Sequence, residues 1–505
     1  MSKTTKALRA GVTGVTGIVS AGAIALGIAA LVTVPLPEYI GTPPSLSVAP
    51  VPALQQRVCP GPLLEVSPQA TEDITFYSTG QALYSEASSE KNFDSWWLDA
   101  VDNLNDSLSA APKVISVPPA ESAEEAPVLA GNQIEQAATE ALSGLAAASC
   151  SEPANDLWLV GGSTEVGRTT LLTLSNPTEV TATVSLEVFT EQGYIDSSAA
   201  DGIIVLPGEQ RILSLAGYAP DAIAPVVRVM SVGGQILANL QQSVTRTLMP
   251  SGVEWIAPGS GAATQQIIAG VVLSGQHDHD RSEVSDVTSD LEPGIRILVP
   301  GEKNSEVTVT LLSNEGKKVE FTANLSAKKV TQLPTAGVPD GVYTVIVTAQ
   351  EPLVAGVRTV QDSSAASPLL EGSPAATPAP SVAPELVAPA ASIGGGDFTW
   401  IASCSFLTET VLIPVPQGPA PVVSFYNPAN RTAEVTMSAP GQKDVVLSVK
   451  AGEMASAQLV ADAKYTAQGA KGLVGGMTFI GSGFGSAIAL NPANVLGSSI
   501  TVYPR

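Results

Sequence analysis

Residues Arg168 to Gly193 read RTTLLTLSNPTEVTATVSLEVFTEQG, and this stretch decides the fold class. Asn176-Pro177 indicates a turn, because Asn tolerates unusual backbone angles and Pro restricts its own φ. Beyond the turn, polar residues alternate with the apolar residues Val180, Ala182, Val184, Leu186 and Val188. This period of two predicts a strand with one buried face.

The stretch continues to Pro258 through further short apolar segments. Pro207-Gly208 ends one predicted strand, and Gly233-Gly234 is expected to join two more as a hairpin. Short strands separated by turns about every ten residues are typical of a β-sandwich or barrel. We therefore predict a mostly β protein with immunoglobulin-like β-sandwich modules.

The same pattern recurs along the chain, which indicates internal repeats. TLSNPTEVTATV at Thr173–Val184 aligns with SFYNPANRTAEV at Ser424–Val435, and GVEWIAP resembles DFTWIAS. Three further segments occupy equivalent positions late in each repeat: VGGQILANLQQSV, AQEPLVAGVRTV and GAKGLVGGMTFI. The second repeat lacks the Asn-Pro turn. The expected modules are module 1 at 157–261, module 2 at 262–361 and module 3 at 397–505, with a Pro/Ala/Ser linker at 362–396.

Length and composition agree with this organisation. The chain has 505 residues, which is enough for about three domains. Its 24 basic and 47 acidic residues give a net charge of −23, and such a field opposes binding to nucleic acid. Only 14% of residues are charged, while 45 Gly and 39 Pro indicate many turns. The composition favours strands over long helices.

The N-terminus indicates the compartment. Lys3, Lys6 and Arg9 precede an uncharged apolar stretch from Ala10 to Pro37, which is long enough to span a bilayer. Basic residues before it orient the remaining chain outward. A cleaved signal peptide is the alternative. We expect residues 1–37 to form a cytoplasmic tip and a single transmembrane helix at the cell membrane, followed by a Pro-rich stalk at 38–56 and an extracellular bulk.

Residues 57–156 are harder to interpret, and we expect a partly irregular region. Asp94–Leu108 has the spacing of an amphipathic helical face, Ala111–Ala130 is rich in Pro, Ala and Glu, and Ile134–Ala148 has a helical composition. The chain has three cysteines, Cys59, Cys150 and Cys404. One disulfide with one free thiol is the simplest arrangement in an oxidising compartment, and three buried thiols are the alternative.

Several motifs occur in a fixed order after the apolar stretch. They are CPGP at Cys59–Pro62, an SC-x-x-P at Ser149–Pro153 and WLVGGST at Trp158–Thr164 before the Asn-Pro strand. This set resembles a family of actinobacterial membrane-anchored or secreted extracytoplasmic proteins, known as a domain of unknown function. The resemblance implies a cell-envelope location and a Cys59–Cys150 disulfide, and it leaves Cys404 outside the motifs. It implies no activity.

Candidate chemical sites are few. His277 and His279 lie in an acidic stretch with Asp278 and Asp280. On a strand the two histidines would share one face and could ligate a metal with a carboxylate, or the carboxylates alone could hold calcium. The stretch lacks the ligand spacing of a known site, so a solvated acidic loop is expected. We find no nucleophile or phosphate-loop motif, and we expect no catalytic residue, cofactor or metal. Trp158, Trp255 and Trp400 are either platforms for a carbohydrate or packing residues. Two of them precede Ile-Ala at matching positions, which favours packing.

These observations predict a non-enzymatic, membrane-anchored scaffold of the cell envelope that binds a protein or glycan partner. An envelope enzyme, or an accessory to one, that acts on cell-wall polysaccharide is the main alternative. A substrate-binding sensor in a membrane complex is another. Fold alone does not separate them, because β-sandwiches host many functions.

Overall fold

A computed structural model describes residues 46–48, 54–66, 75–105, 107, 110–118, 127–274, 292–335, 337–361, 396–490 and 500–502. The predicted transmembrane stretch Ala10–Pro37 and the acidic stretch with His277 and His279 lie outside these residues. The chain forms two compact units, Pro50–Ser498 and a small unit that combines Met1–Ala49 with Ser499–Arg505. In the small unit, β1 (Leu46–Val48) pairs antiparallel with β35 (Ile500–Val502). Within the described residues, no helix has the length and apolarity needed to cross a membrane.

Module 1 consists of two antiparallel sheets around an apolar core. One sheet has the order β19–β18–β12–β16, and the other has the order β11–β17–β13–β14, with β15 also paired to β13. Its strands are β11 (Asp156–Val160), β12 (Arg168–Ser175), β13 (Ala182–Thr190), β14 (Gly193–Ile195), β15 (Ile203–Val205), β16 (Glu209–Ser214), β17 (Val226–Gly233), β18 (Leu237–Arg246) and β19 (Met249–Ile256).

The predicted alternation in module 1 is confirmed over most of its length. Ala182, Val184, Leu186 and Val188 are all at least 96% buried, and they face the core between the sheets. Val180 is 56% exposed, because β13 begins two residues later. The expected hairpin at Gly233-Gly234 is wrong: β17 and β18 belong to different sheets, so this connection crosses from one sheet to the other.

Module 2 repeats the strand order of module 1. The sheet β26–β25–β21–β24 corresponds to β19–β18–β12–β16, and β20–β25–β22–β23 corresponds to the second sheet. The long β25 takes part in both sheets. The strands are β20 (Ala263–Leu273), β21 (Gly294–Leu298), β22 (Ser305–Ser313), β23 (Lys318–Leu325), β24 (Thr331–Pro334), β25 (Gly341–Val360) and β26 (Phe398–Ala402).

The position of β26 changes the expected boundary of module 3. We expected DFTWIAS to open module 3 at residue 397, but β26 pairs with β25 and is the last strand of module 2. The Gln361 amide donates a hydrogen bond to the Asp397 carbonyl at 2.7 Å. The ends of the stretch 362–396 therefore meet. That stretch connects two paired strands of one module and is not a linker between modules.

Module 3 has the same two sheets, β34–β33–β28–β31 and β27–β32–β29–β30. Its strands are β27 (Thr410–Pro414), β28 (Val422–Tyr426), β29 (Ala433–Ser438), β30 (Val445–Val449), β31 (Met454–Gln458), β32 (Lys464–Gln468), β33 (Val474–Ile480) and β34 (Gly485–Ala489). Each repeat that the sequence indicates is therefore one two-sheet module, including the second, which has no Asn-Pro turn.

The region between the cysteines forms a smaller module of the same topology, which we call the Cys-bounded module. Its sheets, β10–β9–β5 and β2–β8–β6, match the first three strands of each sheet in module 1. The strands are β2 (Gln55–Val58), β5 (Leu83–Ser88), β6 (Asp94–Trp97), β8 (Lys113–Val117), β9 (Leu129–Ala138) and β10 (Ser143–Ser149), with a β3 (Leu64–Val66)–β4 (Phe76–Ser78) hairpin. β7 (Asp99–Ala100) pairs in parallel with β16 of module 1.

Expectations for three segments of this region are wrong over the residues that the structure describes. Asp94–Leu108 begins with strands β6 and β7 instead of a helix, and Val101 and Leu104 are exposed. Ala111–Ala130 contains β8, and Ile134–Ala148 forms parts of β9 and β10. Small residues such as Ala146, Ala147 and Ala148 mimic a helical composition. Here they are fully buried between modules, where small side chains let the strands approach closely.

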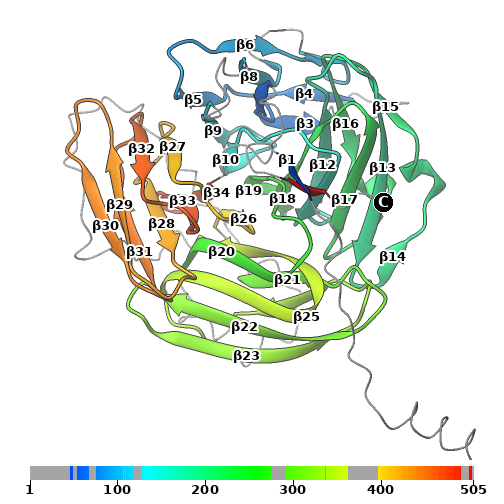
Figure 1. The fold of residues 1–505 in the computed structure, drawn as a ribbon. Helices are drawn as coiled ribbons and strands as arrows, with labels where there is room; N and C mark the ends of the chain where they lie inside the picture. Colours follow the sequence, from blue (N-terminus) through cyan, green and yellow to red (C-terminus); the bar gives the residue numbers. More distant parts are fainter. Residues whose placement is uncertain are drawn as a thin grey trace, which may run out of the picture. The chain divides into compact units, whose positions relative to one another are not determined.

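The four modules close into a ring within Pro50–Ser498. The last strand of each module, β10, β19, β26 and β34, lies near the middle, and each contacts the next (Figure 1). Apolar clusters cover the boundaries between neighbouring modules. Leu63 and Trp255 share one cluster, Trp158 and Val354 share another, and Ile134 of the Cys-bounded module enters the core of module 3.

Candidate functional site

The middle of the ring contains two buried carboxyl groups, Glu254 on β19 and Asp397 just before β26. Glu254 is fully buried and Asp397 is 5% exposed. Four strands from four modules meet here, and each belongs to a different sheet. Their backbone N–H groups therefore need other acceptors, since a buried amide without a partner is unfavourable.

Asp397 supplies acceptors to all four modules. Its Oδ2 accepts hydrogen bonds from the amides of Leu145 at 2.8 Å and Gly485 at 3.3 Å. Its Oδ1 accepts from the amides of Val253 at 3.3 Å and Phe398 at 3.0 Å. One side chain thus connects β10, β19, β26 and β34.

Glu254 connects three of the same strands. Its Oε1 accepts hydrogen bonds from the amides of Trp255 at 2.9 Å and Ala147 at 3.1 Å. The Ser486 hydroxyl lies 2.8 Å from Oε1 and 2.7 Å from Oε2, and the Ala147 amide also donates to that hydroxyl at 2.8 Å. We call Glu254, Asp397 and Ser486 the central polar cluster.

Burial shifts both acids in the same direction. Desolvation raises the pKa of Asp397 to about 8, although its four amide donors oppose the shift. Desolvation also raises the pKa of Glu254 well above its usual value, and the neighbouring charge of Asp397 raises it further. The pair therefore favours a protonated form.

A second buried polar junction joins modules 1 and 2 around Arg296 of β21. Its guanidinium donates to the carbonyl groups of Gly162 at 2.8 Å and Pro225 at 3.1 Å, and it lies over the Trp400 ring at 4.5 Å. Gly162 has φ +91°, which favours glycine, and it belongs to the WLVGGST motif. Burial lowers the pKa of Arg296. This motif therefore holds a module boundary together.

The three tryptophans are packing residues, as their repeat positions predict. Trp158, Trp255 and Trp400 are each at least 95% buried. Trp158 stacks on Phe189, and the Trp400 indole donates to the Gln242 side chain at 2.7 Å. They are not exposed platforms for a sugar.

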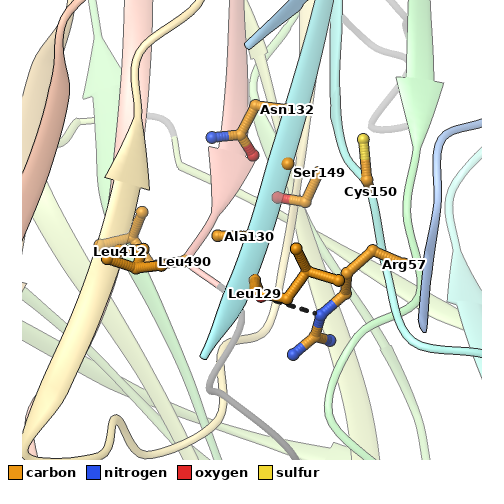
Figure 2. A pocket seen from close by; sticks show the side chains of 9 residues that line it. Arg57, Leu129, Ala130, Asn132, Ser149, Cys150, Leu412 and Leu490 are labelled. Carbon is orange, nitrogen blue, oxygen red and sulfur yellow. Dashed lines mark hydrogen bonds between the residues drawn. The ribbon is translucent and has the colours of Figure 1, made fainter. Parts of the chain in front are cut away.

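A small pocket lies between the Cys-bounded module and module 3 (Figure 2). It has a volume of about 20 Å³, and Arg57, Asn132, Ser149 and Leu412 contribute to its lining. Asn132 already donates to the Pro414 carbonyl at 2.7 Å, and Ser149 donates to the Ala489 carbonyl at 2.8 Å. A space of this size holds about one water molecule.

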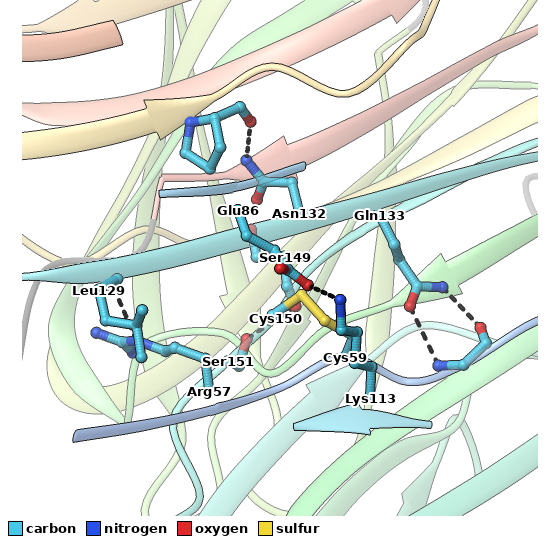
Figure 3. The surroundings of a disulfide bond; sticks show 12 residues. Arg57, Cys59, Glu86, Lys113, Leu129, Asn132, Gln133, Ser149, Cys150 and Ser151 are labelled. Atoms are coloured by element: carbon cyan, nitrogen blue, oxygen red, sulfur yellow. Dashed lines mark hydrogen bonds and ion pairs between the residues drawn. A yellow bond between two sulfur atoms is a disulfide. The ribbon is translucent and has the colours of Figure 1, made fainter. Parts of the chain in front are cut away.

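The cysteines occupy the places that the resemblance implies. Cys59 and Cys150 form a disulfide, with Arg57, Gln133 and Ser151 close by (Figure 3). Cys404 is a buried free thiol, and desolvation raises its pKa to about 11, which makes it a poor nucleophile. His277 and His279 lie outside the described residues. Within the described residues, no three His, Cys, Asp or Glu side chains are grouped as metal ligands.

Sequence reasoning missed Glu254 and Asp397, although it singled out the segments that contain them. The available signal was a single acid inside an apolar segment, in GVEWIAP and DFTWIAS. The sequence around each acid does not show that the two acids lie close together, because Glu254 belongs to module 1 and Asp397 belongs to module 2.

The fold and the central polar cluster define a class of protein, an all-β ring of two-sheet modules fastened by buried polar groups. The chain belongs to a family of unknown function, DUF5719, whose model matches residues 106–451.

A comparison with curated proteins finds no match. The chain is similar to Thermotoga maritima 1070, with 16% identity, a TM-score of 0.16 and coverage of 20% of this chain and 81% of that one. It is also similar to the Anabaena sensory rhodopsin transducer, with 15% identity, a TM-score of 0.16 and coverage of 19% and 97%. Likenesses of this size identify no function.

Proposed function

We propose that the protein is a non-enzymatic scaffold outside the cytoplasm, tethered to the cell membrane by residues 1–37, and that it presents immunoglobulin-like modules to an envelope protein or glycan. The observation that carries the proposal is the central polar cluster. Its carboxyl groups accept hydrogen bonds from backbone amides of neighbouring modules and thereby fix the modules to one another. Such a use of buried acids supports a rigid platform.

The disulfide supports the compartment. Disulfides form and persist in oxidising environments, and Cys59–Cys150 is buried inside a module. The basic residues before Ala10 orient the modules outward if the stretch spans the membrane. Protease added to intact spheroplasts is then expected to digest the modules. Complete protection of a tag placed after Arg505 would contradict this topology.

Complementation of a deletion strain tests the scaffold. Val184→Asp places a charge in the core of module 1, so we expect it to abolish folding and function together. Glu306→Gln and Glu434→Gln change exposed acids at equivalent positions of modules 2 and 3, and we expect normal function. An exposed carboxylate whose loss abolishes function, with unchanged stability and partner capture, would instead favour the envelope enzyme.

A further inference from the structure

The two central acids are held mainly by modules other than their own. Asp397 belongs to module 2 but accepts amides of the Cys-bounded module, module 1 and module 3. Glu254 belongs to module 1 but accepts an amide of the Cys-bounded module and contacts a hydroxyl of module 3. The ring closes through these contacts, so the charge of the pair acts on every module boundary at once.

We propose that Glu254 and Asp397 form a proton-controlled closure, which holds the four central strands together most tightly when both acids carry protons and loosens them as the pair ionises.

The groups that face the pair come from four strands. β10 supplies the backbone amides of Leu145 and Ala147, and β19 supplies the backbone amides of Val253 and Trp255. The start of β26 supplies the Phe398 amide. β34 supplies the Gly485 amide and the Ser486 hydroxyl. Among the described residues, none of these contacts is a cation. Two negative charges at this place would repel each other without a compensating positive charge.

The geometry accommodates a neutral Glu254. Ser486 Oγ lies 2.7 Å from Glu254 Oε2, so a protonated carboxyl group can donate a hydrogen bond to the hydroxyl while Oε1 still accepts both amides. Among the described residues, the four hydrogen-bond partners of the Asp397 carboxyl group are all amide donors. These donors favour its charged form, so Asp397 is expected to lose its proton first and Glu254 to keep the last proton of the pair.

The direction of the pH effect follows from burial. Both acids have a higher pKa in the folded chain than in the unfolded chain, with Asp397 at about 8. An acid of this kind stabilises the fold most below its unfolded pKa, and the contribution is lost as the pH rises through the folded pKa. The closure is therefore expected to be tight at pH 6 and weaker at pH 9.

Hydrogen exchange of the full chain, followed by mass spectrometry, tests the proposal. After correction for the intrinsic rate at each pH, the peptide that covers β10 (Ser143–Ser149) is expected to lose several-fold of its protection between pH 6 and pH 9. A peptide from β13, inside module 1, is expected to change less. Glu254→Gln keeps the acceptor Oε1 and gives Ser486 a permanent donor, so the loss at β10 is expected to become smaller.

Glu135→Gln is the matched control. Burial raises the pKa of Glu135 to about 8 as well, and Glu135 lies on β9 opposite Ala146 of β10, but it accepts a hydrogen bond from the Leu63 amide and is not part of the central polar cluster. This variant is expected to retain the loss of protection at β10. The proposal is overturned if β10 protection is independent of pH in the wild-type chain. It is also overturned if Glu254→Gln leaves the loss unchanged, whether or not Glu135→Gln alters it.

Discussion

Asn176 and Asn427 show how one side chain organises a turn in two modules. The Asn176 side-chain amide donates to the carbonyl groups of Val180 at 2.8 Å and Val205 at 3.0 Å. Asn427 donates in the same way to Arg431 at 2.7 Å and Val449 at 2.8 Å. Both residues are at least 99% buried, so the repeated Asn-Pro has the same structural role in each module.

At the residue scale, we therefore expect Asn176→Ala and Asn427→Ala to destabilise the fold by similar amounts. Each change removes two hydrogen bonds, one of them to the carbonyl group of a fully buried residue, Val205 or Val449, and the loss is about 1–3 kcal/mol. Urea unfolding of the full chain measures it. Glu179→Ala, an exposed neighbour, is the control and is expected to leave the unfolding midpoint unchanged. Unaltered stability of both Asn variants would contradict the role assigned to the turn.

At the scale of elements, the Cys59–Cys150 disulfide joins the end of β2 to the end of β10. The two cysteines are 91 residues apart, and closing a loop of that length stabilises a fold by about 4–5 kcal/mol in the chain-entropy model. Replacing both cysteines with Ala is expected to lower the denaturant midpoint strongly. A non-reduced digest is expected to contain the linked Cys59 and Cys150 peptides in the wild-type chain and in Cys404→Ala. A cross-link from Cys404 to either partner in the wild-type chain would disprove the pairing.

The β18–β19 hairpin turns through Thr247 and Leu248, with φ of +49° and +69°. A branched and a bulky residue are unfavourable in this region, where Asn-Gly is preferred. We expect Thr247→Asn with Leu248→Gly to raise the Tm of the full chain by a few degrees, because the backbone strain is relieved. Leu248→Ala is the control: it removes the exposed side chain but keeps the strained φ, so it should give no comparable rise. Equal Tm values for the double variant and the wild type would argue against strain.

At the scale of the whole molecule, the ring depends on the antiparallel pairing of β25 with β26. Val360, the last residue of β25, pairs with Phe398, the first residue of β26, and the Gln361 amide donates a hydrogen bond to the Asp397 carbonyl. Replacing residues 363–395 with Asn-Gly is therefore expected to preserve the Tm and the β-type circular dichroism spectrum. Removing β26 itself is the control, and we expect it to unfold the ring because Asp397 and Trp400 contact other modules. Loss of folding after this replacement would show that residues 363–395 do more than connect the two strands.

The sequence by itself determined the repeated module. Period-two alternation and the Asn-Pro turns are local signals, and they predicted the mostly β fold, the core positions from Ala182 to Val188 and the packing of the tryptophans. The ordered Cys motifs, through a family resemblance, implied the disulfide. Local signals succeed here because the side-chain period of a strand depends only on its own residues and on which face is buried.

Only the tertiary structure decided the Cys-bounded module, the place of β26 and the central polar cluster. Alanine-rich β9 and β10 resemble a helix in composition, and they become strands because neighbouring modules bury both of their faces. Glu254 and Asp397 are separated in sequence by most of module 2, so their meeting depends on how the modules close into a ring. Contacts between modules set these features, and no local pattern encodes such contacts.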